Sequence, residues 1–193
     1  MVNNGRGQVS EARTRLLTTA SQIFYAEGLH SVGIDRIVAE AKVTRATLYR
    51  HFAGKDELVV AYLQTVAGME RDQFAQALAS GESASDVLRA VAASIAAGIG
   101  SPGFRGCAFL NAAAEYPDRA HPVLQTVLEH REWFLSTVSD LFAQIDEPSA
   151  TSAGRHFMML RDGAMAAGCL TDSAEVGATF VAGVEGLLTY RSS

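Results

Sequence analysis

Hydroxyl, aromatic and cationic side chains gather in one short segment near the start of the chain, and they are the types that contact a nucleic acid. In VTRATLYRH, residues 43–51, Leu48 has the spacing of a core residue with Phe52 four positions later, so the other side chains lie on the outer surface of a short helix. Arginine can pair with guanine or phosphate, threonine with a thymine methyl group or phosphate, and tyrosine and histidine can donate to backbone oxygens. The residues that we expect to contact a DNA duplex are Thr44, Arg45, Thr47, Tyr49, Arg50, His51 and Lys55.

Three predicted helices would hold these side chains in place. The first runs from Ser10, a plausible N-cap, to Gly28, a C-terminal stop. The second covers residues 34–41, and the third covers residues 45–52 with Thr44 as its N-cap. Two short helices joined by a tight turn and braced by a longer one form a helix-turn-helix. The apolar face of the first helix consists of Leu16, Leu17, Ala20, Ile23, Phe24 and Ala26.

The charge distribution separates this region from the rest of the chain. The 193 residues carry a net charge of −5, yet residues 1–55 hold eight basic and four acidic side chains, a net charge of +4. The remaining residues carry −9. Such an asymmetry indicates that one segment meets a polyanion, although an imbalance of this size can also arise by chance.

The composition favours a folded, all-helical protein. Hydrophobic residues make up 48% of the chain and charged residues 19%, which argues against intrinsic disorder. No stretch shows the period-two alternation of a strand. We therefore expect an all-α fold of about nine helices, with an N-terminal three-helix head and a C-terminal helical bundle. The later helices are expected over residues 55–78, 86–99, 107–116, 120–145, 150–167 and 173–190.

No segment of the sequence resembles a membrane span or a secretory signal. The longest apolar run, residues 91–100, is about half of the roughly 20 residues that a span requires, and the N-terminal residues are polar. The two cysteines, Cys107 and Cys169, form no CxxC pair. We expect a cytoplasmic protein without a membrane partner.

The segment EGLHSVGIDRIVAEAKVTRATLYRHFAGKDELVVAY, residues 27–62, resembles the DNA-binding region of TetR-family transcriptional regulators. The likeness is most specific in VTRATLYRHFAGKDEL, residues 43–58. Two positions depart from the family pattern. Lys42 stands where the family commonly has a turn glycine, and Val32-Gly33 replaces the Thr or Ser that usually opens the second helix. We expect Ser31 to substitute for the missing hydroxyl.

The resemblance implies that the chain has three segments with different roles. It implies a flexible arm over residues 1–9, a DNA-binding domain over 10–55, and an effector-binding and dimerisation domain over 56–193. It further implies a homodimer, most often a repressor, that binds a near-palindromic DNA operator and is released by a small-molecule effector. A small-molecule-binding helical protein without operator binding is the alternative.

The effector site is the least determined part of this expectation. The segment GFRGCAFLNAAAEYPDRAHPVLQ, residues 103–125, resembles a pattern that recurs in a subset of the family. Large apolar side chains in this half suit a mostly apolar effector, although core packing is the default for any one of them. Asn111 and Glu115, one helical turn apart, are either pocket anchors or structural hydrogen-bonding groups. The candidate effector residues are Phe109, Asn111, Glu115, Trp133, Phe134 and Met159.

The last segment, SAEVGATFVAGVEGLLTY, indicates a dimer on physical grounds. A helix that is apolar on nearly every side must be covered on nearly every side, and its glycines suit the close approach of another helix. The alternative is an interior helix of a monomer. The predicted interface residues are Phe180, Gly183, Val184 and Leu187.

Catalytic and metal-binding motifs are absent from the sequence. There is no GxSxG, HExxH, P-loop or glycine-rich dinucleotide motif, so we expect neither an enzyme nor a cofactor. His121, His130 and His156 lack metal-ligand spacing. Cys107 fits a small buried apolar residue better than a reactive thiol, and an enzyme that uses Cys107 or Glu115 is a remote alternative.

Overall fold

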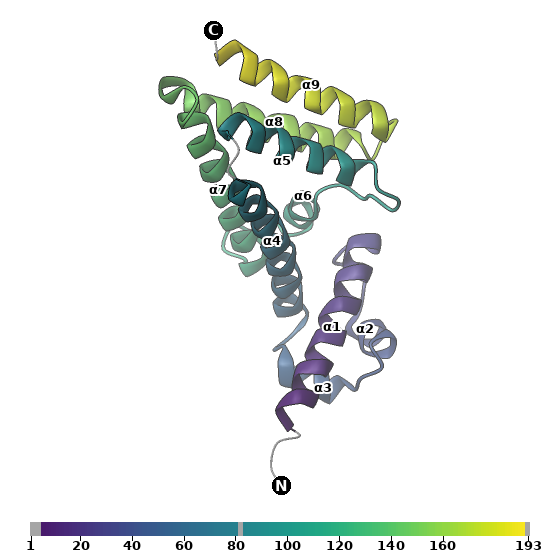
Figure 1. Cartoon of the computed structure of the whole chain (residues 1–193). Coiled ribbons are helices and arrows are strands. Elements are labelled where there is room, and N and C mark those ends of the chain that lie inside the picture. Colours follow the sequence, from purple (N-terminus) through teal and green to yellow (C-terminus); the bar gives the residue numbers. More distant parts are fainter. Residues whose placement is uncertain (1–4, 81–82, 192–193) are drawn as a thin grey trace. The chain divides into compact units, whose positions relative to one another are not determined.

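The computed structural model describes residues 5–80 and 83–191, and within these ranges it contains nine α-helices, one short 3-10 helix and no strand (Figure 1). The predicted all-α fold is therefore confirmed. No helix in the described ranges combines the length and apolar character that crossing a membrane requires. The elements are α1 (Gly5–Glu27), α2 (Ile34–Glu40), α3 (Arg45–His51), α4 (Lys55–Ala79), α5 (Ala84–Ile99), α6 (Ala108–Glu115), α7 (Pro122–Ala143), η1 (Glu147–Ser149), α8 (Ala150–Ala167) and α9 (Ser173–Arg191).

Helix α1 begins earlier than its sequence pattern predicts. It starts at Gly5 rather than at Ser10, so residues 5–9 of the predicted flexible arm are helical, and residues 1–4 lie outside the described ranges. Once a helix is nucleated, each further residue adds one backbone hydrogen bond, so a helix can extend past a plausible N-cap.

The chain divides into two compact units. The N-terminal unit comprises the residues up to 66 together with 111–127, and the C-terminal unit comprises residues 67–110 and 128–193. The N-terminal unit therefore extends beyond the predicted boundary at residue 55. It includes the first turns of α4 and a segment drawn from the end of α6 and the start of α7.

In the core of the N-terminal unit, helices α1, α2 and α3 pack against one another. Leu16 of α1, Ile37 of α2 and Leu48 of α3 are fully buried, and Phe52 is 2% exposed. Ala26, which the spacing placed on the apolar face of α1, is exposed instead, because it lies in the last turn of the helix. Burial of each large side chain contributes about 1.5–3 kcal/mol to stability.

The turn between α2 and α3 has the hydrogen bonds of a Schellman motif. The N–H of Val43 donates to the carbonyl of Val38 at 3.0 Å, and the N–H of Lys42 donates to the carbonyl of Ala39 at 3.2 Å. In this motif the first residue after the helix adopts the left-handed conformation, which favours glycine. Here that residue is Lys42, with φ of 53°.

Lys42→Gly is therefore expected to stabilise the protein by about 1 kcal/mol, because glycine adopts the left-handed region without the steric clash of a Cβ atom. The measurement is the urea midpoint of unfolding at constant m-value. Lys42→Ala is the control, since alanine removes the charge but keeps the Cβ atom. Equal midpoints for the Gly and Ala variants would contradict the backbone explanation.

In the C-terminal unit, α9 packs against both α5 and α8 (Figure 1). The rings of Phe157 and Phe180 meet edge to face with centroids 5.8 Å apart. Small residues permit this close packing: a Cβ atom on Gly177 would lie 3.4 Å from Ala96, and one on Gly183 would lie 3.3 Å from Leu160.

Two of the four predicted dimer-interface residues belong to the core of the chain itself. Phe180 and Val184 are 3% and 1% exposed, Leu187 packs against the same buried cluster, and Gly183 faces Leu160 of α8. Gly183 and Leu187 are half-buried, and the assignment of the four residues to a dimer contact stays a prediction. An apolar stripe on a helix has the same sequence pattern whether its neighbour is the same chain or another one.

Candidate nucleic-acid interface

Helix α3 separates its apolar and polar side chains as the sequence predicts. Leu48 is buried, whereas Tyr49 is 52% exposed and Arg50 is exposed. Thr44 is the N-cap: its Oγ1 accepts a hydrogen bond from the N–H of Thr47 at 3.1 Å, and the two hydroxyl oxygens lie 2.9 Å apart. The short helix therefore presents hydroxyl, phenol and guanidinium groups to solvent.

Arg45 is held by a partner that the sequence did not reveal. Its Nε donates to Oδ1 of Asp35 at 2.5 Å, and its Nη2 contacts the same carboxylate. Both side chains are more than half exposed, and the hydrogen bond to Asp35 is the main reason that the pKa of Arg45 lies above its usual value. Asp35 and Arg45 lie in the first turns of α2 and α3, so the pair links the two helices of the helix-turn-helix.

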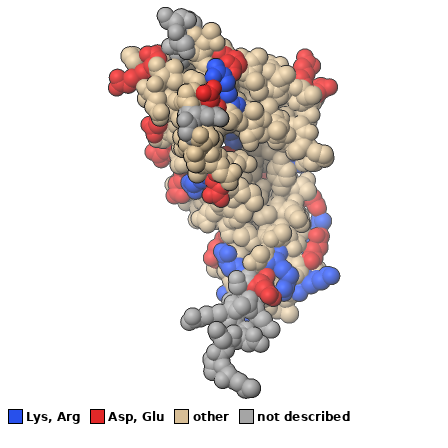
Figure 2. All heavy atoms as spheres, viewed as in Figure 1, with Lys and Arg blue, Asp and Glu red and all other residues tan. Residues whose placement is uncertain are grey.

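A second basic side chain of the N-terminal unit, Arg36, is also paired with acids. Arg36 contacts the carboxylates of Glu27 and Glu40, the latter through Nε at 2.8 Å. On the face drawn in Figure 2, basic and acidic side chains lie next to one another over this unit. Two of the basic side chains, Arg36 and Arg45, are therefore directed by neighbouring acids.

Three further polar side chains near the candidate interface are partly buried or hydrogen-bonded within the chain, which the sequence did not indicate. The Nε2 atom of His51 is buried and has no hydrogen-bond partner among the described residues. Lys55 donates from Nζ to the carbonyl of His30 at 3.4 Å. Partial burial lowers the pKa of Lys55, and this effect outweighs the nearby carboxylates, which raise it. Ser31 donates its hydroxyl proton to the carbonyl of Glu27 at 2.6 Å, so this hydroxyl caps α1 instead of standing free.

Glu115 fixes the loop between α1 and α2. Its Oε1 accepts from the N–H of Leu29 at 2.7 Å, its Oε2 accepts from the N–H of His30 at 2.6 Å, and Nε2 of His30 lies 2.8 Å from the carbonyl oxygen of Glu115. Gly28 has φ of 93°, and a Cβ atom there would lie 3.3 Å from Oε1. Both carboxylate oxygens of Glu115 are thus engaged within the N-terminal unit, which favours the structural interpretation of this residue over that of an effector contact.

A second set of polar contacts reinforces this loop. The hydroxyl of Tyr116 donates to Oδ1 of Asp56 at 3.1 Å, and Nε2 of His121 lies 3.3 Å from Oδ2 of the same carboxylate. Burial, followed by the bond to Asp56, raises the pKa of Tyr116 above its usual value. The ring of Tyr116 also lies 4.5 Å from that of His30. These contacts explain why residues 111–127 join the N-terminal unit.

Glu115→Ala is expected to destabilise the α1–α2 loop by about 1–3 kcal/mol, because two backbone N–H groups lose their acceptor. The measurement is hydrogen exchange at the amides of Leu29 and His30, which should accelerate, together with the urea midpoint. Glu11→Ala, which removes an exposed carboxylate from α1, serves as the control. Unchanged exchange at both amides would contradict the assigned role of Glu115.

Three of the six candidate effector residues lie together in the C-terminal unit, and a fourth lies elsewhere on its surface. Phe109 stacks on His130 with ring centroids 3.7 Å apart, and the rings of Trp133 and Phe134 lie 5.5 Å and 6.4 Å from the same histidine. Met159, by contrast, is 70% exposed on α8. Asn111 and Glu115 belong to the N-terminal unit.

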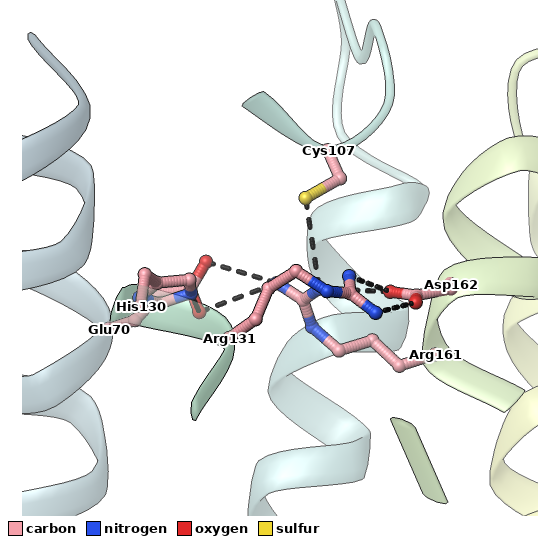
Figure 3. A network of polar contacts seen from close by, with 6 residues as sticks. All are labelled: Glu70, Cys107, His130, Arg131, Arg161 and Asp162. Carbon is pink, nitrogen blue, oxygen red and sulfur yellow. Dashed lines mark hydrogen bonds and ion pairs between the residues drawn. The ribbon is translucent and has the colours of Figure 1, made fainter. Parts of the chain in front are cut away.

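Figure 3 shows a network of polar contacts among Glu70, Cys107, His130, Arg131, Arg161 and Asp162. This network adjoins the aromatic rings through His130 and Arg161. Arg161 is 3% exposed and His130 2%, and both contact the carboxylate of Glu70: Nη2 of Arg161 lies 3.2 Å from Oε1, and Nε2 of His130 lies 3.2 Å from Oε2. The guanidinium of Arg161 also lies 4.8 Å from the ring centroid of Phe134, and its Nη1 lies 3.7 Å from Sγ of Cys107. Burial acts to raise the pKa of Glu70, but the nearby ring of His130 and the charge of Arg161 outweigh it, so this pKa lies below its usual value.

The sequence carried a signal for this network that its interpretation missed. Arg161 interrupts the apolar repeat of α8, and His130 interrupts that of α7, although both positions face inward. A charged or polar residue at a core-facing position requires a buried partner. The partner is Glu70 in both cases, and no local pattern predicts it, because Glu70 lies 91 residues from Arg161 and 60 residues from His130.

Comparisons with known proteins agree on one family. Residues 16–62 match the family described as bacterial regulatory proteins, tetR family. The chain is 62% identical to a TetR-family transcriptional regulator from Streptomyces coelicolor, whose crystal structure it matches with a TM-score of 0.92 over 95% of this chain and 97% of that one.

Curated relatives match over shorter segments. The transcriptional activator FasR of Mycolicibacterium smegmatis is 44% identical over 54 residues, which are 28% of this chain and 25% of FasR. The regulator UidR of Escherichia coli K12 is 33% identical over 63 residues, 33% of this chain and 32% of UidR. The chain thus matches about a quarter and a third of the lengths of these two proteins.

Proposed function

Because the chain belongs to the TetR family of transcriptional regulators, we propose that it is a homodimeric repressor that binds a near-palindromic DNA operator through the outer face of α3. The observation that supports this most directly is the division of α3 into a buried side at Leu48 and an exposed side with Tyr49 and Arg50. In a dimer of this kind the two recognition helices enter successive major grooves, with half-sites roughly 34–36 Å apart.

Each candidate residue has a contact that its chemistry favours. Arg45 and Thr47, near the N-terminus of α3, are suited to base edges, and Tyr49 and Arg50 to phosphate oxygens. Thr44 and His51 lie at the two ends of the same helix, and Lys55 opens α4, where free N–H groups attract a phosphate. The Asp35 carboxylate beside Arg45 repels phosphate but leaves the guanidinium oriented, which favours a base over the backbone as the partner of Arg45.

Arg45→Ala is expected to weaken operator binding by about 5- to 150-fold, the range for loss of one bidentate base contact. The measurement is fluorescence anisotropy with a labelled promoter fragment at several salt concentrations. Binding by the wild type should weaken steeply with salt.

Arg89→Ala is the matched control, since Arg89 is also exposed and ion-paired, here with Glu185 of the C-terminal unit. Equal losses in both variants, or salt-independent binding by the wild type, would contradict the proposed role of α3.

The exposed faces of α8 and α9 support the homodimer. Ala178, Ala182 and Gly186 follow one another at four-residue intervals on α9, and all three are exposed. A Cβ atom on Gly186, or on the exposed Gly163 of α8, would meet nothing within 4 Å. Glycine in a helix interior costs about 1 kcal/mol relative to alanine, so packing within the chain does not account for these two residues. The close approach of a second copy of the chain does.

Ala182→Glu is expected to shift the protein from dimer to monomer, because a carboxylate would be buried at a closely packed helix contact. Sedimentation velocity should give twice the chain mass of 20.5 kDa for the wild type and the chain mass for the variant. Ala93→Glu, on an exposed position of α5, should remain dimeric. A dimeric Ala182→Glu variant would exclude this face as the interface.

Regulation requires an effector that favours a dimer with wrongly spaced recognition helices. A small, mostly apolar molecule bound in the C-terminal unit with a differential affinity of about 1–3 kcal/mol would weaken operator binding by about 5- to 150-fold. In vitro transcription from an operator-bearing template decides the sign of regulation. A repressor lowers the yield, and an increase would identify an activator.

A further inference from the structure

The buried network of the C-terminal unit contains donors that the protein does not satisfy. The Nε atom of Arg161 and both ring nitrogens of His130 are buried and lack a hydrogen-bond partner among the described residues. A buried polar group without a hydrogen-bond partner destabilises the folded state. Three such atoms, on two side chains that both contact Glu70, therefore mark a site at which a partner is missing, either an ordered water or a ligand.

Glu70 occupies this site imperfectly. Its oxygens lie 3.2 Å and 3.4 Å from Nη2 of Arg161 and 3.2 Å from Nε2 of His130. Charge-assisted hydrogen bonds are ordinarily about 2.7–2.9 Å long. All three contacts of Glu70 are longer than this range. The neighbouring ion pair of Arg131 with Asp162 has one contact of 2.7 Å and one of 3.2 Å, and Nη1 of Arg161 lies 3.6 Å from the same carboxylate.

We infer that Arg161 and His130 form a carboxylate-binding site that Glu70 occupies from within the chain, and that a small organic acid with an apolar body displaces Glu70 and binds in its place. The inference rests on the proposed function, because it names the chemical class of the effector. Phe109 and Phe134, each 1–2% exposed, and the half-buried Trp133 supply apolar surface beside the two donors.

The charges of the site support an exchange of this kind. Arg161 and Arg131 balance Glu70 and Asp162, so an additional anion would leave a net negative charge unless one carboxylate departed. The side chain of Glu70 is 23% exposed, compared with 3% for Arg161, so Glu70 is the member of the pair that has access to water. Its departure would remove the polar contacts that tie this part of α4 to α7 and α8.

Glu70→Ala provides a test, because the expected gain in ligand affinity is opposite to the loss that general disruption of the site would cause. Removal of the internal competitor should increase the affinity for benzoate by about tenfold or more, since each charge-assisted hydrogen bond contributes about 1.5–3 kcal/mol. Benzoate should also raise the melting temperature of Glu70→Ala more than that of the wild type. Benzamide, the neutral analogue of benzoate, should show neither effect.

Trp133 supplies the binding signal, because it is the single tryptophan of the chain and its ring lies 5.5 Å from that of His130. Fluorescence titrations at constant ionic strength would compare the wild type, Glu70→Ala and Glu185→Ala. Glu185 pairs with Arg89 on the surface of the same unit, so Glu185→Ala should bind benzoate as the wild type does. Arg161→Lys should bind benzoate more weakly than the wild type, because lysine keeps the charge but cannot present the forked donors of a guanidinium.

Three outcomes would overturn the inference. They are equal benzoate affinity in the wild type and Glu70→Ala, equal affinity for benzoate and benzamide, and an ordered water only at the two donors in a structure soaked with benzoate. If Glu70→Ala fails to fold, Glu70→Gln takes its place, with a smaller gain in affinity expected. Operator binding is measured separately without benzoate, so a failure of the proposed DNA binding and a failure of the carboxylate site give different results.

Discussion

The candidate DNA-binding surface depends on the burial of two side chains. Helix α3 spans seven residues, and an isolated helix of this length is not stable in water. It exists because Leu48 and Phe52 are buried in the N-terminal unit and because Thr44 caps its first turn. The polar residues on the outer side contribute little to this stability. They can therefore differ between proteins of the same fold, whereas the apolar residues beneath them cannot differ much in size.

Local patterns in the sequence predicted most of the fold. Apolar residues at helical spacing, together with Thr44 as a cap and Gly28 as a stop, placed α3 and the end of α1 within one residue of their positions. The start of α1 was not predictable in this way, because helix propagation depends on what precedes it. The left-handed backbone at Lys42 was likewise visible only as a departure from a family pattern, and the structure shows that the turn keeps its geometry without glycine.

The polar contacts of the candidate sites were largely beyond prediction. Asp35 orients Arg45 from ten residues away, and Glu115 holds the α1–α2 loop across 85 and 86 residues. Neither pairing has a local signature. Arg161 and His130 differ in this respect, because each stands at a core-facing position of an apolar helix. The sequence thus indicates that a buried polar group exists but not which group satisfies it.

The conformation of Lys42 has a consequence for how the N-terminal unit evolves and is engineered. A glycine would relax the turn, yet it would also remove one of the eight basic side chains of residues 1–55 and lower their net charge from +4 to +3. Long-range attraction to a polyanion depends on that total, while thermal stability depends on the backbone. A laboratory selection for heat resistance alone would therefore tend to discard a cation that a selection for fast DNA association would retain.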